Sequence, residues 1–375
     1  MIQRKYLLPI LMSAAIWTSC TNDIEQMDDT DNIRLSFDVA GIEEGVQTTR
    51  GTIITGDVNN GNKFSGDLKL YVAQNEGTST AGKFAGASKV YTVSTPGSHN
   101  TGVKWPGFGL AFYAFAPASS TYNSDYPTAE PTPIASSPYT TYSAGEHIVP
   151  AYSSQKDLLF AFQPIRTLAA NGMDVPLTFN HILSRITFQV RQPKSGESGA
   201  FTNGETLTLK SISLVNVKST STGTFGNGAT HATTRFDWTT PSGKATYTMN
   251  FTSTSTIGNG SFDIAGEQKG VYLNSGSGDS MFMLPHANNL FVETNVGGAI
   301  VPADDSLLQI VYRISTESTD RTARFKLKTV ASGHKWEMGV WTNYQFTIKA
   351  NYITLNPITV AGWGNANNVP VSVEE

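Results

Sequence analysis

The sequence is poor in cysteine, in charge and in long apolar runs. Its 375 residues include a single cysteine, Cys20, so no disulfide can form within the chain and folding must rest on the burial of apolar side chains. Charged residues make up 15% of the chain and the net charge is −4, whereas nucleic-acid-binding proteins usually present a basic face. The sequence has no heptad repeat and no amphipathic helix longer than two turns. It therefore disfavours both a helical protein and a nucleic-acid-binding protein.

Local motifs of catalysis and metal binding are also missing. The six histidines form no H-E-x-x-H or H-x-H motif, and there is no G-x-S-x-G nucleophile elbow. Residues 223–228 are rich in glycine but lack the lysine of a phosphate-binding loop, so we expect a turn there. His181 stands just before a hydrophobic strand, where a structural histidine is commoner than a metal ligand. We therefore predict no enzymatic activity, no catalytic residues, no metal and no cofactor. The alternative is a site assembled from distant residues, which would need a deep pocket with converging carboxylates or histidines.

Glycine, proline and small polar residues are plentiful. The 34 glycines and 17 prolines suit short strands joined by many turns. The length is a prior for two domains, and the turn-rich segment 219–234 is the best place to divide them. We therefore expect an all-β fold of two tandem antiparallel β-sandwich domains, comprising residues 33–220 and 221–375.

Alternation of apolar and polar residues predicts the individual strands. Residues 110–117 are apolar on both faces, as in a strand that is covered on each side. Residues 118–150, rich in Pro, Ser, Thr and Tyr, are expected to form a long surface loop. The other expected strands are 33–39, 68–73, 90–93, 157–162, 175–190, 207–217, 247–251, 262–264, 280–285, 307–314, 324–330 and 344–348.

The N-terminus has the features of an export signal. A positively charged start precedes an apolar run from Tyr6 to Trp17, which is too short to span a bilayer comfortably. Cys20 follows a small residue directly after this run, which resembles a bacterial lipobox. We therefore predict a lipoprotein signal peptide over 1–20, lipid on Cys20 and an acidic tether over 21–32. An ordinary signal peptide is the alternative.

Two further stretches bear on assembly. Arg50 precedes Gly51 in a polar stretch and is a candidate site for a trypsin-like protease, although an ordinary exposed arginine would have the same sequence. The final segment, 351–375, contains strands that can pair within their own domain or with a neighbouring molecule. The apolar residues that alternate along these strands are Ile353, Leu355, Ile358 and Val360.

Several blocks, in the order in which they occur, resemble the fimbrillin family, the subunits of the type V pili of Bacteroidota. These blocks are Trp105–Pro106 with 112–117, then 175–188, 219–225, 282–285 and 336–348, together with the lipoprotein start. The resemblance implies two transthyretin-like β-sandwich domains and export as a lipoprotein to the outer membrane and cell surface. It also implies a structural or adhesive role in a fimbrium, with other fimbrillin-type subunits as partners.

The resemblance implies specific roles for the two ends of the chain. Family pilins are cut after an arginine that follows the first strand, and a cut after Arg50 would remove both the lipid and the strand 33–39. The groove left behind would accept a donor strand from the C-terminus of another subunit, by β-strand addition. A stalk subunit would be cut and would polymerise, whereas an anchor would keep its lipid. A tip adhesin would use 118–150 to contact a partner.

A different class of function is that of a non-polymerising surface lipoprotein that binds glycans or a ligand on a host or bacterial surface. Exposed aromatic rings would stack on the sugars, and the candidates are Trp105, Tyr122, Tyr126 and Tyr139. Two short stretches, 279–281 and 305–307, also resemble the Bacteroidota O-glycosylation pattern around Ser280 and Ser306, but three-residue matches arise often by chance.

Overall fold

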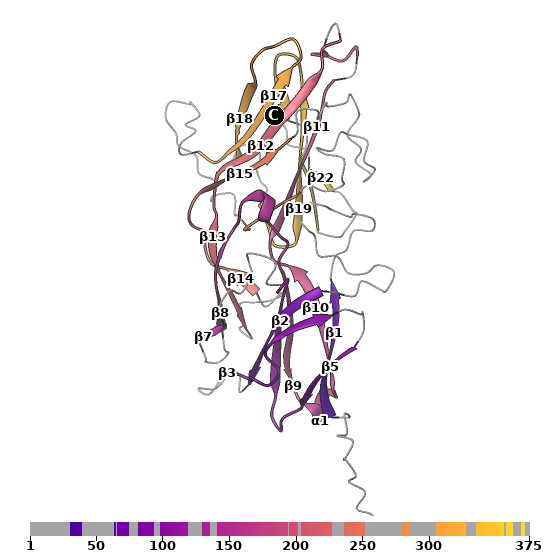
Figure 1. Ribbon diagram of the computed structural model, residues 1–375, viewed down its shortest axis with the longest axis vertical. Helices are drawn as coiled ribbons and strands as arrows, with labels where there is room; N and C mark the ends of the chain where they lie inside the picture. The colour runs from indigo at the N-terminus through magenta and orange to yellow at the C-terminus, as the bar shows by residue number, and fades with distance from the viewer. Residues whose placement is uncertain are drawn as a thin grey trace, which may run out of the picture.

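The structure is a computed structural model that describes residues 31–39, 64, 66–74, 82–93, 98–118, 130–135, 141–193, 195–201, 204–226, 236–251, 280–285, 305–327, 335–355, 358–362 and 369–371. Nearly all regular elements in these ranges are strands, which confirms the all-β prediction. The molecule is elongated, with the strands of the two halves at opposite ends (Figure 1). The named helices are the short α1 (Leu168–Asn171) and the 3-10 turn η3 (Tyr152–Ser154). No described helix is long and apolar enough to cross a membrane.

The N-terminal half is built on an eight-stranded sheet that encloses its own core. The strand order is β3-β2-β6-β9-β10-β1-β5, and β4 pairs with β2. Apolar side chains of β1 and β10 form one buried cluster with those of β2 and β6, so the two ends of the sheet face each other. The strands are β1 (Asn32–Val39), β2 (Gly66–Gln74), β3 (Gly82–Lys83), β4 (Val90–Val93), β5 (Ser98–Lys104), β6 (Leu110–Ala116), β9 (Leu159–Arg166) and β10 (Asp174–His181). Every residue of β6 is buried, as its apolar sequence predicts.

The outer face of this sheet is covered by a four-stranded sheet with the order β14-β13-β8-β7. Its strands are β7 (Thr132–Ala135), β8 (Thr141–Ile148), β13 (Thr220–Gly226) and β14 (Phe236–Trp238). Aromatic rings fill the space between the two sheets. The ring of Phe225 on β13 lies 4.7 Å from that of Tyr113, 5.2 Å from that of Phe115 and 5.3 Å from that of Tyr142, measured between centroids.

Two predictions are wrong in this sheet. Residues 132–135 and 141–148 form β7 and β8, although 118–150 was expected to be a surface loop. The buried positions of β8 include the small Ala144 beside Tyr142, so the apolar alternation is weak in the sequence. Residues 223–226 complete β13 instead of forming a turn, because Phe225 is buried and its strand pairs with β8.

The C-terminal half is a sandwich of two further sheets. One has the order β16-β11-β19-β21-β22, with β20 on β19, and the other has the order β15-β12-β17-β18. Apolar side chains of β11 and β19 share one cluster with those of β12 and β17. The strands are β11 (Ser184–Arg191), β12 (Leu207–Val217), β15 (Ala245–Asn250), β16 (Met281–Met283), β17 (Leu307–Ile314), β18 (Arg321–Lys326), β19 (Val340–Ile348), β20 (Ile353–Leu355), β21 (Ile358–Gly362) and β22 (Val369–Val371). The expected strand at 262–264 lies outside the described residues.

The opposite face of β11 and β19 is polar yet buried. These strands are parallel, with Thr187 opposite Asn343 and Gln189 opposite Gln345. The Thr187 hydroxyl donates to Asn343 Oδ1 (3.0 Å), and the amide nitrogens of Asn343 and Gln345 both donate to Gln189 Oε1 (2.9 and 2.6 Å). Because these groups satisfy one another, the ladder can be buried without the penalty of unpaired polar atoms.

Strand pairing crosses the expected domain boundary near residue 220 in both directions. β11 and β12 precede this boundary but pair with β19 and β17 of the C-terminal half. β13 follows β12 in the chain and returns to pair with β8 of the N-terminal half. A division at residue 220 therefore does not separate the sheets, because turn-rich composition marks connections without revealing which strands they join.

The aromatic packing yields a test of stability. We expect Phe225→Ala to lower the free energy of unfolding by about 3–5 kcal/mol, since the side chain is fully buried among aromatic rings. Phe108→Ala is the matched control, because Phe108 is 40% exposed and its loss should change stability by less than about 1 kcal/mol. Urea denaturation measures both, and equal effects would contradict this packing.

A buried histidine predicts a pH dependence. Burial lowers the pKa of His147 on β8 to about 4, and its ring lies 5.8 Å from that of Trp238. In the unfolded state the histidine pKa is near 6.5. As the pH falls from about 6.5 to 4, the unfolded state therefore binds a proton at His147 that the folded state does not bind. The free energy of unfolding should fall by about 3 kcal/mol over this range relative to His147→Gln, measured by denaturation at each pH. Parallel pH profiles for the two proteins would contradict the assignment.

Candidate functional site

The site with the clearest geometry is the position of β1, which lies between two partners inside its sheet. On one side β1 is parallel to β10, with Leu35 opposite Val175 and Phe37 opposite Leu177. On the other side it is antiparallel to β5, where Leu35 faces His99. We call the space between β10 and β5 the β1 slot. Because both edges of β1 form backbone hydrogen bonds, its removal would leave two unpaired strand edges facing each other.

Every second side chain of β1 points into the N-terminal core. Ile33, Leu35, Phe37 and Val39 are all buried, with exposed fractions of 3% or less. The ring of Phe37 lies 6.3 Å from the rings of both Phe64 and Phe179, and these two lie 4.7 Å apart. The slot is therefore a row of apolar pockets that accepts alternate side chains of one extended strand.

Polar contacts hold β1 in register. The Thr101 hydroxyl on β5 donates to the carbonyl oxygen of Ile33 (2.9 Å). The amide of Arg34 donates to Met173 O (3.0 Å), and the amide of Phe64 donates to Phe37 O (3.1 Å). These contacts bind backbone atoms, so they would accept any strand with suitable alternate side chains.

A buried tyrosine supports the β5 side of the slot. The ring of Tyr91 meets that of His99 edge-on, with centroids 5.3 Å apart. Burial raises the pKa of Tyr91 to about 12, so its hydroxyl stays protonated and donates to Ala87 O (3.0 Å). Residues such as Phe64, Thr101 and Tyr91 were not singled out from the sequence, because their role depends on contacts with β1 from distant parts of the chain.

The C-terminal donor candidates lie on their own sheet. Ile353 begins β20, which pairs with the end of β19, and it packs against the core. Ile358 and Val360 belong to β21, which pairs with β19 through residues 340–343, and Leu355 ends β20. β22 pairs with β21 at the end of this sheet. The predicted lipidation site Cys20 and the predicted cleavage site Arg50–Gly51 lie outside the described residues.

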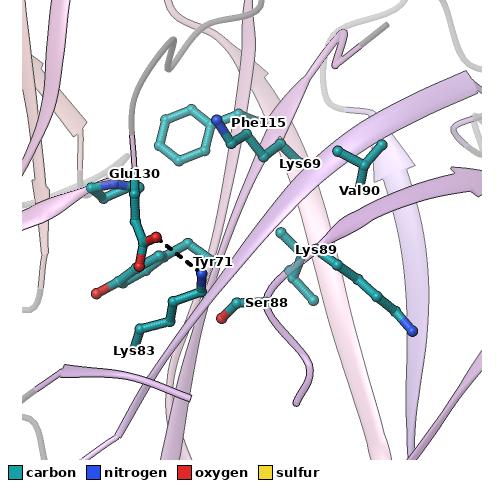
Figure 2. Close-up of a pocket in the computed structure, with 10 residues that line it drawn as sticks. Lys69, Tyr71, Lys83, Ser88, Lys89, Val90, Phe115 and Glu130 are labelled. Atoms are coloured by element: carbon teal, nitrogen blue, oxygen red, sulfur yellow. Dashed lines mark ion pairs between the residues drawn. The ribbon is translucent and has the colours of Figure 1, made fainter. Parts of the chain in front are cut away.

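A cavity of about 240 Å³ lies on the face of β2 that points away from the core around β1 (Figure 2). Tyr71 and Phe115 contribute aromatic surface, and Lys69 and Lys83 bring positive charge to it. Figure 2 shows the ion pair across one side, in which Lys83 Nζ lies 3.1 Å from a Glu130 carboxylate oxygen. Exposed pairs of this kind contribute little to stability. The lining combines apolar and charged groups, and its one serine, Ser88, donates its hydroxyl to the carbonyl oxygens of Phe84 (2.9 Å) and Val72 (3.3 Å).

Other sequence candidates are structural in the described parts of the chain. His181 Nδ1 lies 2.8 Å from Asp157 Oδ2, with both side chains buried, as expected of a structural histidine. No three His, Cys, Asp or Glu side chains of the described residues gather as a metal site would require. Ser280 and Ser306, from the glycosylation-like stretches, are both buried, so the folded chain does not present them to a modifying enzyme.

The glycan-binding alternative loses one of its aromatic candidates. Trp105 is 8% exposed and packs edge-on against Phe112, with ring centroids 5.8 Å apart. Its face therefore belongs to the core and is not available to a sugar. The remaining candidates, Tyr122, Tyr126 and Tyr139, lie outside the described residues.

Comparison with known protein families shows to which family the chain belongs. The family model of fimbrillin-like proteins matches residues 49–363. The chain belongs to the fimbrillin-like family. The match begins one residue before Arg50 and leaves out β1. Membership in the fimbrillin-like family implies a cell surface location and suggests contact with other pilus subunits.

Solved structures resemble this fimbrillin-like protein only remotely. A candidate cell adhesion protein from Bacteroides ovatus is 14% identical, with a TM-score of 0.47 over 92% of this chain and 99% of that chain. Another from Bacteroides uniformis is 12% identical, with a TM-score of 0.44 over 84% and 98%. A fimbrial assembly protein from Parabacteroides distasonis is 9% identical, with a TM-score of 0.37 over 91% and 100%. No curated protein matches the chain.

The slot predicts which changes in β1 matter. Phe37→Ala should lower the free energy of unfolding by about 3–5 kcal/mol, because it leaves a cavity between Phe64 and Phe179. Asp38→Ala, at a half-buried position on the other face of the same strand, should change it by less than about 1 kcal/mol. Hydrogen exchange of the β1 amides should accelerate in the first variant only. If both variants exchange alike, the alternate side chains do not hold β1.

Proposed function

We propose that this chain is a structural and adhesive pilus subunit without catalysis, which matures by loss of β1 and assembles by donor-strand addition. The observation that carries this proposal is the β1 slot. β1 is the first strand of the fold, it lies inside a sheet, and a cut after Arg50 would remove it and no other described strand.

The energetics of the slot favour replacement over an empty groove. Burial of a Val, Leu, Ile or Phe side chain contributes about 1.5–3 kcal/mol, so the four apolar side chains of β1 contribute about 6–12 kcal/mol. This is comparable with the whole free energy of unfolding of a typical domain, about 5–15 kcal/mol. A subunit that has lost β1 should therefore bind another strand with high affinity, and the backbone edges of β10 and β5 provide the hydrogen bonds.

The donor comes from segment 351–375 of another copy, and the geometry favours its last strand. β22 is at the end of its sheet and pairs with β21 through three residue pairs, whereas β20 and β21 together cover the edge of β19. Release of β22 therefore breaks three residue pairs and leaves the edge of β19 covered. Pro370 has no amide hydrogen, which suits an edge strand. Val369, Val371 and Val373 alternate with other residues, as Ile33, Leu35 and Phe37 do in β1.

The export route follows from the same proposal. Lipid on Cys20 would bring the precursor to the outer membrane, and cleavage after Arg50 would release it for assembly into a fimbrium. A chain that keeps β1 and its lipid would instead serve as an anchor, because its slot is already filled.

The processing step has a direct test. Mass spectrometry of the protein from cells should find a chain that starts at Gly51. Arg50→Ala should retain an acylated Cys20, while Gln47→Ala, a change in the same stretch that keeps the arginine, should be cut as the unmodified chain is. An acylated Cys20 throughout the unmodified protein would rule out the stalk role and favour an anchor.

Strand exchange has a separate test. Protein that starts at Gly51 should form ladders on SDS gels, because donor strands resist the detergent. Deletion of 363–375 from this protein should abolish the ladders, since it removes β22, and protein that retains β1 should stay monomeric. Persistent monomers of the Gly51 chain, or ladders that survive the deletion, would contradict the proposed donor.

A further inference from the structure

One end of the N-terminal half carries exposed apolar side chains. Phe108 is 40% exposed and Ile165 is 44% exposed. They lie close together, because a Cβ atom placed on Gly109 would come within 2.5 Å of Ile165 Cγ2. The ring of Phe84 meets that of Phe108 edge-on, with centroids 6.1 Å apart. We call Phe84, Phe108 and Ile165 the apolar tip.

The chain enters the fold beside this tip. The amide of Trp105 donates to Asp31 O (3.0 Å), and Asn32 pairs with Lys104. Figure 1 shows that β1 begins at this end of the molecule, close to α1 and β5. The apolar tip is therefore next to the point where the segment after Cys20 joins the fold.

The sequence limits how far this end can lie from a lipid on Cys20. Ten residues, 21–30, separate Cys20 from Asp31. A fully extended chain of that length reaches at most about 40 Å, at about 3.5 Å per residue. A tether this short keeps the apolar tip at a high effective concentration near the lipid surface, so even a weak contact would be populated. The C-terminal half lies at the far end of the molecule (Figure 1).

Apolar contact is the interaction that this surface offers. Aromatic and aliphatic side chains that protrude from a fold are suited to the boundary between headgroups and acyl chains. Arg34, Lys104 and Arg166 lie at this end together with Asp31 and Asp174, so the two signs of charge nearly balance and add little attraction to anionic lipid. Among the possible partners, the position beside the tether favours a lipid surface over a second copy of the chain.

We propose that, in the lipidated chain, the apolar tip contacts the outer membrane surface. The contact gives the molecule a defined orientation, with the C-terminal half directed away from the membrane. This proposal rests on the lipid anchor proposed above. It adds a second membrane contact, made by the folded protein itself, which neither the anchor nor strand exchange requires.

The single cysteine makes a clean experiment possible. In the acylated chain the thiol of Cys20 is blocked, so Phe108→Cys introduces the one thiol that a polarity-sensitive fluorophore can label. Ile165→Cys is a second tip variant in case the first folds poorly. Tyr352→Cys is the matched control, because Tyr352 is 50% exposed and follows β19 in the C-terminal half, at the other end of the molecule from the apolar tip (Figure 1). The labelled proteins are placed in phosphatidylcholine–phosphatidylglycerol vesicles, with and without a lipid that carries a spin-label quencher.

We expect blue-shifted emission at positions 108 and 165, and quenching by the spin-labelled lipid at least about twofold stronger there than at position 352. Equal quenching at the three positions would overturn the proposal. A blue shift without lipid quenching that grows with protein density would also overturn it, and would point to a second copy of the chain. Mass spectrometry of the same preparation reads the acyl group independently. An unacylated Cys20 overturns both the lipid anchor and the tip contact. Acylated protein in which quenching is equal at positions 108, 165 and 352 overturns the tip contact alone.

Discussion

Burial of one strand between two others is the constraint on which the N-terminal half depends. The apolar side chains of β1 complete the core inside the rolled sheet, and its backbone joins β10 to β5. Without β1 the sheet would end at β10, and the rings of Phe64 and Phe179 would lose their neighbour Phe37. The fold is therefore complete only with a strand in this slot. Its pockets and backbone contacts do not require that strand to come from the same chain.

The C-terminal half is organised differently. There the parallel pair β11 and β19 is buried on both faces, one apolar and the other an amide and hydroxyl ladder. The edge of β19 is covered by β20 and β21, and β22 pairs with β21 at the periphery of the sheet. In the proposed assembly, one half provides the position that a donor strand fills, and the other half provides that strand. The buried cluster that contains the aromatic rings of β13, β6 and β8 continues into the sandwich of β11, β12, β17 and β19, so one core joins the two halves.

Strong local alternation explains what could be predicted from the sequence. The strands at 33–39 and 307–314 were predicted because large apolar residues alternate along them, and the strand at 110–116 was predicted because its apolar run is continuous. β7 and β8 were missed because Thr, Ser, Gly and Ala at their positions look like a loop, and only pairing with β13 makes them strands. The burial of Gln189 and Asn343 could not be read from their polar character, since it depends on partners more than 150 residues away. Trp105 was a candidate for sugar binding because the sequence does not reveal that its ring packs on Phe112.

The same limit applies to the candidate site. The alternation in β1 predicts a strand with one buried face, but its parallel pairing with β10 joins residues about 140 positions apart. The tandem transthyretin-like arrangement, lipidation and cleavage remain predictions of the family resemblance. Their common physical requirement is that the β1 slot can exchange its strand.

Peptide competition on protein that starts at Gly51 tests this requirement most directly. A synthetic peptide of residues 31–40 should bind the open slot and raise the thermal unfolding temperature. A peptide of residues 363–375 should displace a labelled 31–40 peptide, because both fill the space between β10 and β5. Simultaneous binding of the two peptides, or no binding of the 31–40 peptide to a folded Gly51 chain, would contradict the claim that one slot serves both strands.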